Sequence, residues 1–137
     1  MGERGRGRTR RVSGTVPSAS TVLLRRGAIV VVDFDPIVGS EAARSRPAVI
    51  VSNNTANAAA TRTGGVVTVV PLTGNTARVH PFQVLLPAGA TGLPRDSKAQ
   101  AEQVRTVSVA RIRSAAGWAT TELMRELDAA LRLHLGL

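Results

Sequence analysis

The chain of 137 residues is long enough for one domain, and its 43% hydrophobic residues can fill a core. It contains no cysteine, which excludes disulfides, thiol catalysis and cysteine-ligated zinc, and it has only two histidines, which disfavours a histidine-rich metal site. The longest uninterrupted apolar run, residues 28–32, is too short to cross a bilayer. We therefore expect a cytoplasmic protein with no membrane segment and no metal or other cofactor.

The net charge of +9 is concentrated at the amino-terminal end. Residues 1–26 hold seven arginines and one acid, a net +6, whereas residues 27–137 carry a net +3. Residues 1–24 are rich in Gly, Arg and Ser without apolar periodicity, so burial cannot offset the entropy of ordering them. We predict a disordered basic tail over 1–24 and one domain over 25–137. The tail is either a phosphate-binding arm or a solvated extension.

Beyond the tail, short apolar runs alternate with Gly, Pro and Asn, which is typical of antiparallel β-structure. The predicted strands are 28–34, 48–52, 66–72, 82–86 and 98–107. Residues 53–61 form either a short helix or an irregular segment, and residues 87–94 form a turn region. Residues 109–112 either extend the fifth strand or form a short turn.

The carboxyl-terminal segment changes to a helical period. From Thr120 onward, apolar residues at spacings of three and four fall on one stripe: Leu123, Leu127, Ala130, Leu131 and Leu135. Thr120 is placed to cap the helix and Gly136 to end it. The expected fold class is therefore mainly β with α, a small SH3-like or OB-like antiparallel barrel closed by a C-terminal helix.

Few residue types remain that suit chemistry in such a barrel. Phe34 and Phe82 lie in predicted strands and are expected in the core, which disfavours an aromatic platform for stacking bases. His80 is expected at the surface, so chemistry with two histidines as acid and base is also disfavoured. Asp33 and Asp35 have no third ligand at a fitting spacing for a metal.

Charged and hydroxyl side chains are the remaining candidates. The stretch GSEAARSRPAVIVSNN, residues 39–54, places arginines just ahead of a strand, and Pro47 forces an extended backbone at Arg46. Thr73 directly follows the third predicted strand. We expect neighbouring second and third strands to put Arg46 and Thr73 at opposite ends, unless the strands run parallel or one end folds across the sheet.

Four short motifs follow one another in order between residues 25 and 137. They are G-S-E at 39–41, R-P-A-V at 46–49, P-L-T-x-N at 71–75 and Q-x-R-T at 103–106. In this order and spacing, the sequence resembles the MazF/PemK/Kid family of toxin endoribonucleases. The resemblance implies an SH3-like barrel that forms a homodimer and cleaves single-stranded mRNA at short motifs without a metal, and so inhibits translation. It also implies inhibition by a cognate MazE-like antitoxin.

The resemblance also implies roles for individual residues. Arg46 and Thr73 match residues that are catalytic in relatives, and the G-S-E motif lines the site. The implied RNA-contacting residues are Ser40, Arg44, Glu102, Gln103, Arg105 and Thr106. One departure stands out, because the Kid-like branch has an Arg and an Asp in the stretch aligned with Gln100 and Glu102. Glu102 keeps only the carboxylate, so that branch's catalytic assignment does not transfer whole.

These residue types suit scission of RNA by its own 2′-hydroxyl, which builds negative charge on phosphorus. Arg46 offers a rigid fork of donors to phosphate oxygens, and Thr73 offers a hydroxyl donor. Glu41 either orients Arg46 or accepts a proton, and Arg44 adds positive potential. Because arginine is a poor general base, that role stays open between Glu41 and Glu102.

Two rival functions remain at this stage. CcdB-like toxins resemble the same barrel but poison gyrase, and a third reading is a non-catalytic RNA-binding barrel. The R-P and P-L-T motifs favour the endoribonuclease, since a gyrase poison has no use for a hydroxyl and an arginine on a phosphate.

Overall fold

The computed structural model describes residues 22–34 and 45–137, and the elements named below lie within these ranges. The strands are β1 (Ala28–Asp33), β2 (Ser45–Ile50), β3 (Val66–Thr73), β4 (Gln83–Leu86), β5 (Ser97–Gln100), β6 (Arg105–Ser108) and β7 (Ile112–Trp118). The α-helices are α1 (Asn54–Thr63), α2 (Ala88–Thr91) and α3 (Thr121–Leu135). Two 3₁₀ turns, η2 (Ala101–Gln103) and η3 (Val109–Arg111), flank β6.

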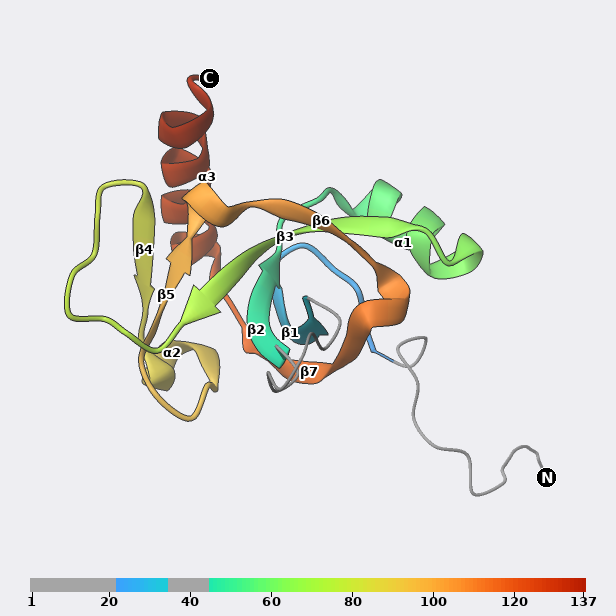
Figure 1. Cartoon of the computed structure of the whole chain (residues 1–137), viewed down its shortest axis with the longest axis horizontal. Coiled ribbons are helices and arrows are strands. Elements are labelled where there is room, and N and C mark those ends of the chain that lie inside the picture. Colours follow the sequence, from blue (N-terminus) through green and yellow to red (C-terminus); the bar gives the residue numbers. More distant parts are fainter. Residues whose placement is uncertain (1–21, 35–44) are drawn as a thin grey trace, which may run out of the picture.

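The strands form one antiparallel sheet in the order β4-β5-β3-β2-β1-β7, and β6 pairs with β3. In Figure 1 the strands β1, β2, β3, β6 and β7 curl around a common centre, and β4 and β5 extend from one side. Among the described residues β7 pairs only with β1, so the sheet is not closed into a complete barrel. The expected class, mainly β with a carboxyl-terminal helix, is confirmed.

The predicted strand 98–107 is wrong in one respect, because η2 divides it into β5 and β6. The first half of β3 pairs with β6, where Val66 lies opposite Ser108. Its second half pairs with β5, where Leu72 lies opposite Ala99. The two short strands therefore follow the same edge of β3 on either side of the turn. This arrangement lets β5 turn away to pair with β4 while β6 stays on the curled part.

Other boundaries also differ from those expected. β2 begins at Ser45 rather than at residue 48, and α2 lies within the predicted turn region 87–94. β7 was not predicted at all. Its pairing with β1 is interrupted by two register shifts, between Ile29 and Val30 and between Val31 and Val32, which are typical of a strand that bends.

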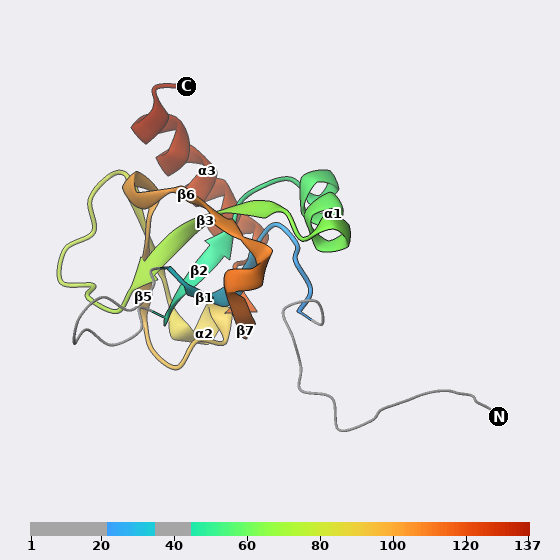
Figure 2. The same ribbon diagram turned by 45° about the vertical axis from the view of Figure 1, so that its right-hand side comes forward.

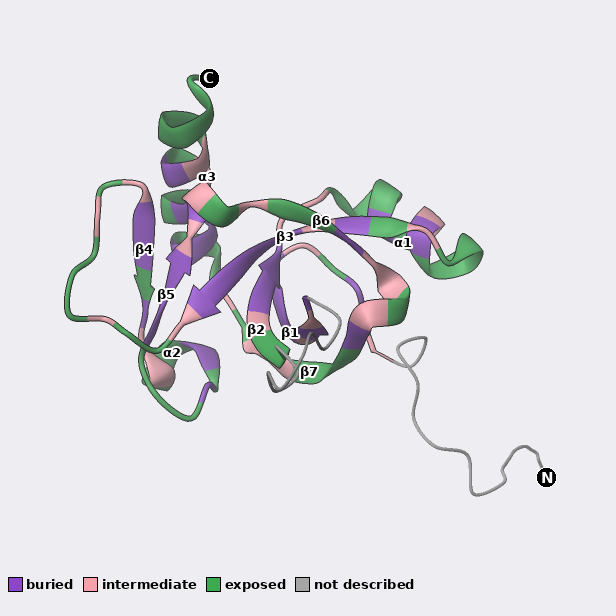
Figure 3. Cartoon of the chain, viewed as in Figure 1, coloured by how far each residue is buried: buried purple, intermediate pink, exposed green. Residues whose placement is uncertain are grey.

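Two clusters of buried side chains fill the interior (Figure 3). One lies among β3, β4, β5 and α3 and includes Leu72, Leu86 and Leu127. The other lies inside the curled strands and includes Val32 and Phe34. Phe34 is thus in the core as predicted, whereas Phe82 is half-buried and stacks on His80 with ring centroids 5.1 Å apart.

The helix α3 begins and ends where the sequence predicts, and α1 forms over the segment 53–61 that the sequence left open, extending to Thr63. The Asn53 side chain accepts a hydrogen bond from Ala56 N at 2.8 Å, and Thr120 accepts one from Leu123 N at 3.1 Å. Gly136 has a φ of 73° and ends α3. The helix α3 packs against β4 and η2, while α1 and α2 stand apart from one another in both views (Figures 1 and 2). No helix within the described ranges has the length and apolar character needed to cross a membrane.

Candidate functional site

The pairing of β2 with β3 brings Arg46 and Thr73 together. The two strands are antiparallel, with Ala48 opposite Pro71. Continued past this last paired position, the register carries Arg46 and Thr73 to the same end of the two strands. The expectation that these residues lie at opposite ends was wrong, because in an antiparallel pair the beginning of one strand adjoins the end of the other.

Arg46 and Thr73 line one hollow of about 390 Å³, which we call the Arg46–Thr73 hollow. Its described lining is formed by Ser45, Arg46, Pro47, Leu72, Thr73, Gly74, Leu93, Pro94, Arg95 and Ser97. This set contains two arginines and no acidic residue. The walls are apolar and hydroxyl-bearing, so the hollow suits an anion that also presents an apolar face.

Thr73 is held in a defined orientation by the turn that follows β3. Its Oγ1 accepts a hydrogen bond from Asn75 N at 3.3 Å, and the Asn75 side chain accepts one from Ala77 N at 3.3 Å. Because the Thr73 hydroxyl accepts in this turn, its own proton remains available to donate to a ligand in the hollow.

Asp33 fixes the beginning of β2. Its carboxylate accepts a hydrogen bond from Ser45 Oγ and pairs with Arg113 Nη1 of β7 at 2.8 Å. Arg111 adds a hydrogen bond to the Asp33 carbonyl oxygen at 3.3 Å. The hydrogen bond from Ser45, followed by that from Arg113, lowers the pKa of Asp33 below its ordinary value. Ser45, the residue before Arg46, is thus linked through Asp33 of β1 to Arg113 of β7.

Arg95 is a lining residue that the sequence did not single out. It lies in the connection between α2 and β5, and its guanidinium covers Gly74. A methyl group at position 74 would lie 3.0 Å from Arg95 Nε and 3.1 Å from Cζ. Glycine at position 74 therefore makes room for this guanidinium beside Thr73.

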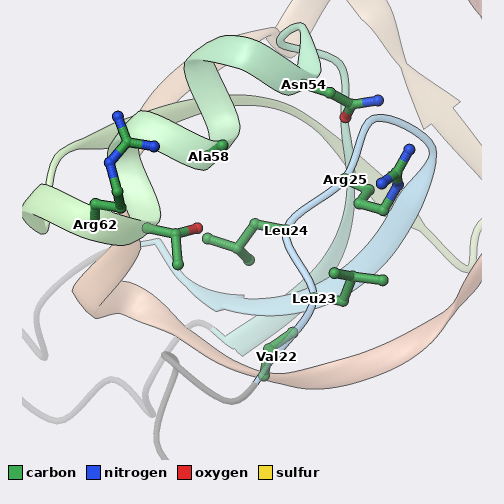
Figure 4. A pocket seen from close by; sticks show the side chains of 8 residues that line it. Val22, Leu23, Leu24, Arg25, Asn54, Ala58 and Arg62 are labelled. Atoms are coloured by element: carbon green, nitrogen blue, oxygen red, sulfur yellow. The ribbon is translucent and has the colours of Figure 1, made fainter.

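A second hollow, of about 410 Å³, lies between the segment before β1 and the helix α1. Figure 4 shows Leu24 facing Ala58 and Arg62 across it. None of the predicted site residues within 22–34 and 45–137 lines this hollow. Leu24, which the sequence analysis assigned to the tail, is buried in the core cluster inside the curled strands.

The described residues contain no group of three or more His, Asp or Glu side chains placed to hold a metal ion.

Comparison with known proteins identifies the family. The sequence profile of a family described as "PemK-like, MazF-like toxin of type II toxin-antitoxin system" matches residues 25–135. The chain belongs to this toxin family. It is 55% identical over 116 residues to a protein named endoribonuclease MazF9 from Mycobacterium tuberculosis, covering 84% of this chain and 98% of the relative.

Solved structures agree with the family assignment. The MazE–MazF structure (Form-II) from Deinococcus radiodurans superposes with a TM-score of 0.67 at 27% identity, covering 82% of this chain and 96% of that chain. An endoribonuclease in complex with its cognate antitoxin, from a mycobacterial species, superposes with a TM-score of 0.63 at 26% identity, covering 82% and 95%. The family resemblance seen in the sequence is thus confirmed.

Of the two other family motifs, G-S-E and Q-x-R-T, the structure describes only the second. Ser40, Glu41 and Arg44 fall outside the described residues. The Q-x-R-T residues lie on η2 and β6, where Gln103, Arg105 and Thr106 are exposed. These three residues are therefore accessible to a ligand, but they do not line the Arg46–Thr73 hollow.

Arg105 also contacts the core. Its guanidinium lies 5.0 Å from the centroid of the Phe34 ring, and Phe34 directly precedes the 35–44 segment. Arg105 thus lies over a core aromatic ring and, because it is exposed, still presents donor groups at the surface.

Glu102 does not line the Arg46–Thr73 hollow. Its Oε2 accepts a hydrogen bond from Gln83 Nε2 at 2.8 Å, and its Oε1 is buried without a hydrogen-bond partner among the described residues. The Gln83 side chain in turn accepts a hydrogen bond from His80 N at 3.1 Å. Glu102 therefore takes part in a network that supports the 74–82 connection.

Proposed function

We propose that this protein is the toxin of a type II toxin–antitoxin pair and acts as an endoribonuclease. It cleaves single-stranded mRNA at short sequence motifs, without a metal ion, and so inhibits translation. The observation that carries the proposal is the meeting of Arg46 and Thr73 in a hollow whose described lining has no acidic residue. A guanidinium and a hydroxyl at one point are the donors that a phosphodiester needs.

The reaction is an attack of the RNA 2′-oxygen on the adjacent phosphorus. The bond between the 2′-oxygen and phosphorus forms, and the bond between phosphorus and the 5′-oxygen breaks. The products are a 2′,3′-cyclic phosphate and a 5′-hydroxyl. Arg46 and Thr73 donate hydrogen bonds to the phosphoryl oxygens, whose negative charge increases in the transition state. The turn after β3 positions the Thr73 hydroxyl before substrate binds, and Asp33 holds Ser45, the residue next to Arg46.

The 2′-hydroxyl proton must pass to a base, and the leaving 5′-oxygen must receive a proton. Of the two carboxylates weighed for the base, Glu102 lies outside the hollow and is bonded to Gln83. We assign the base to Glu41, which belongs to the segment that directly precedes β2. The leaving 5′-oxygen takes up a proton from water while Arg46 donates a hydrogen bond to it, and Arg44 adds positive potential for the RNA backbone.

The proposed partners follow from the family. A cognate MazE-like antitoxin inhibits the toxin, in keeping with the antitoxin complexes formed by the mycobacterial and Deinococcus relatives. The functional unit is a homodimer, and it acts in the cytoplasm, where mRNA is found. Ser40, Gln103, Arg105 and Thr106 contact RNA beyond the scissile phosphate.

The test is to incubate the purified protein with a long RNA in excess EDTA. We expect cleavage to persist, and we expect Arg46→Ala to lower the cleavage rate by at least about 100-fold, the scale of losing one preorganised donor. Thr73→Val keeps the side-chain shape and removes the hydroxyl, and it should lower the rate in the same direction. Arg62→Ala, which removes an exposed arginine of α1, is the charge control and should cleave like wild type.

Other results identify the rival functions. RNA binding without cleavage indicates a non-catalytic RNA-binding barrel, and intact RNA with inhibited gyrase indicates a CcdB-like toxin. Cleavage that EDTA abolishes and Mg²⁺ restores contradicts the metal-independent mechanism. An Arg46→Ala variant with the wild-type rate removes Arg46 from it.

A further inference from the structure

The Arg46–Thr73 hollow is lined by a second arginine, Arg95, which comes from a different part of the fold. Arg46 comes from β2, whereas Arg95 comes from the connection between α2 and β5. No motif of the sequence analysis includes Arg95. Its charge is not needed for the fold, because residue 95 is exposed.

The position of Arg95 is set by its contact with Gly74. A Cβ built on this glycine would lie 3.0 to 3.2 Å from Arg95 Nε, Cζ and Nη2 together. A point at similar distances from three bonded, coplanar atoms lies over the plane, so the flat face of the guanidinium rests on the glycine backbone. Its N–H groups, which lie in that plane, remain directed sideways along the hollow.

The backbone that carries Arg95 is anchored on both sides. Pro94 precedes it, and Leu93 is buried in the core. The Asp96 carboxylate accepts a hydrogen bond from Ala88 N at 2.8 Å, and Ser97 Oγ donates one to the Arg95 carbonyl at 3.4 Å. The neighbouring carboxylate is thus bonded at the beginning of α2, and the guanidinium is presented from a fixed support.

The order of these groups along the hollow suggests what Arg95 binds. Arg46 lines the hollow together with Thr73, and Arg95 covers Gly74, the next residue along the chain. The hollow therefore presents two cations along with the Thr73 hydroxyl. An RNA strand whose scissile phosphate meets Arg46 and Thr73 carries a further phosphate one nucleotide away on each side.

We propose that Arg95 binds the RNA backbone phosphate next to the scissile one and so fixes the strand in the hollow. This inference rests on the proposed function. Because a phosphate carries no base identity, Arg95 adds affinity for every RNA sequence and does not select the cleavage motif.

The experiment compares wild type, Arg95→Gln and Gly74→Ala by steady-state cleavage of one short RNA at several salt concentrations. We expect Arg95→Gln to raise KM about tenfold, with kcat within about threefold of wild type, since one charge-assisted contact is lost in ground state and transition state alike. The slope of log affinity against log salt should become shallower by about 0.7. Gly74→Ala, which displaces the guanidinium but keeps its charge, should raise KM in the same direction.

Two controls define the site of the effect. Arg62→Gln removes one exposed arginine that does not line the Arg46–Thr73 hollow, and it should leave KM and the salt slope unchanged. The second control uses two RNAs, each with one neutral methylphosphonate linkage, placed before the cleavage site in one RNA and after it in the other. The effect of Arg95→Gln on KM should differ between these two RNAs. With one of them, wild type and Arg95→Gln should have the same KM, because the charge that Arg95 binds is missing.

The outcomes separate this inference from the proposed function. A wild-type protein that leaves RNA intact overturns the proposed function and the inference with it. Normal cleavage by wild type with unchanged KM and salt slope in Arg95→Gln overturns the inference alone. So does a fall in kcat at constant KM, which would place Arg95 on the scissile phosphate, and so does a changed cleavage motif.

Discussion

Asp33 holds the residue next to the proposed catalytic arginine and does not itself line the hollow. It connects Ser45 at the beginning of β2 with Arg113 of β7, and both contacts require its carboxylate to be charged. The beginning of β2 therefore depends on an ion pair that is part of the sheet. Because Arg46 follows Ser45 directly, loosening this contact acts on the orientation of Arg46 as well as on stability.

Asp33 should make stability depend on pH at the acid end. Its pKa is lower in the folded protein than in the unfolded chain, so it contributes stability at pH values above its unfolded pKa of about 4, and this contribution is lost as the pH falls through that range. We expect Asp33→Asn to lower the free energy of unfolding at pH 7 by on the order of 1 kcal/mol.

The measurement for Asp33 is thermal unfolding between pH 7 and pH 3. The difference between wild type and Asp33→Asn should shrink as the pH falls. Glu126→Gln, which changes an exposed carboxylate of α3, is the matched control and should follow the wild-type profile. Parallel profiles for wild type and Asp33→Asn would contradict the assignment of the lowered pKa to this network.

At the same scale, sequence motifs identified only part of the site. Arg46 and Thr73 each lie in a short family motif, and antiparallel pairing explains why they meet. Arg95 has no such signal, because PRDS is composed of ordinary turn residues. Its proposed role follows from its contact with Gly74. The two residues lie in different connections of the fold, so no motif or spacing in the sequence indicates that they meet.

Among the elements, the strands with continuous β-branched runs were predictable and β7 was not. β1 and β3 read AIVVVD and VVTVVPLT, whereas β7 reads IRSAAGW and has a single β-branched residue. Tertiary pairing with β1 decides its conformation. The turn η2 was missed for a related reason, since nothing local in AEQ shows that β3 exchanges one partner strand for another at that point.

Gly117 explains how β7 can lie against α2. A Cβ at this position would come 2.3 Å from the Thr91 carbonyl oxygen, which is backbone and has little freedom to move. We expect Gly117→Ala to destabilise the protein by about 1–3 kcal/mol, as in other overpacked sites, measured by urea unfolding.

Gly89 in α2 is the matched control for Gly117, because no atom lies within 4 Å of a Cβ built there. Gly89→Ala should stay within about 0.5 kcal/mol of wild type. An equally stable Gly117→Ala would mean that β7 and α2 separate at little cost, and that this contact does not define the fold.

For the whole molecule, the proposed homodimer would enlarge the positive surface that is offered to RNA. Residues 27–137 carry only +3, so one domain offers a limited positive surface to RNA. A two-fold dimer, the commonest assembly of identical chains, doubles the number of Arg46–Thr73 hollows on one particle.

We expect a solution mass of twice the 14.3 kDa of one chain, measured by light scattering on the same fractions that are assayed for RNA cleavage. Dilution that produces monomers should lower the activity per chain. A monomer with full activity would contradict the dimer as the functional unit.

The basic tail belongs to the scale of the whole molecule, because the family match begins only at residue 25. Residues 1–20 carry five arginines, one acid and no aromatic residue, so they can neutralise phosphates but offer no ring to stack on a base. We expect deletion of residues 1–20 to leave the cleavage motif unchanged and to make the salt dependence of RNA affinity shallower, by about 0.7 for each arginine that contacts a phosphate. Full-length and truncated protein are compared on one long RNA at two salt concentrations, with the 5′ ends of the fragments mapped and the affinity measured. A changed cleavage motif would mean that the tail takes a defined place on the RNA. An unchanged salt slope would mean that the tail does not touch the RNA and is only a solvated extension.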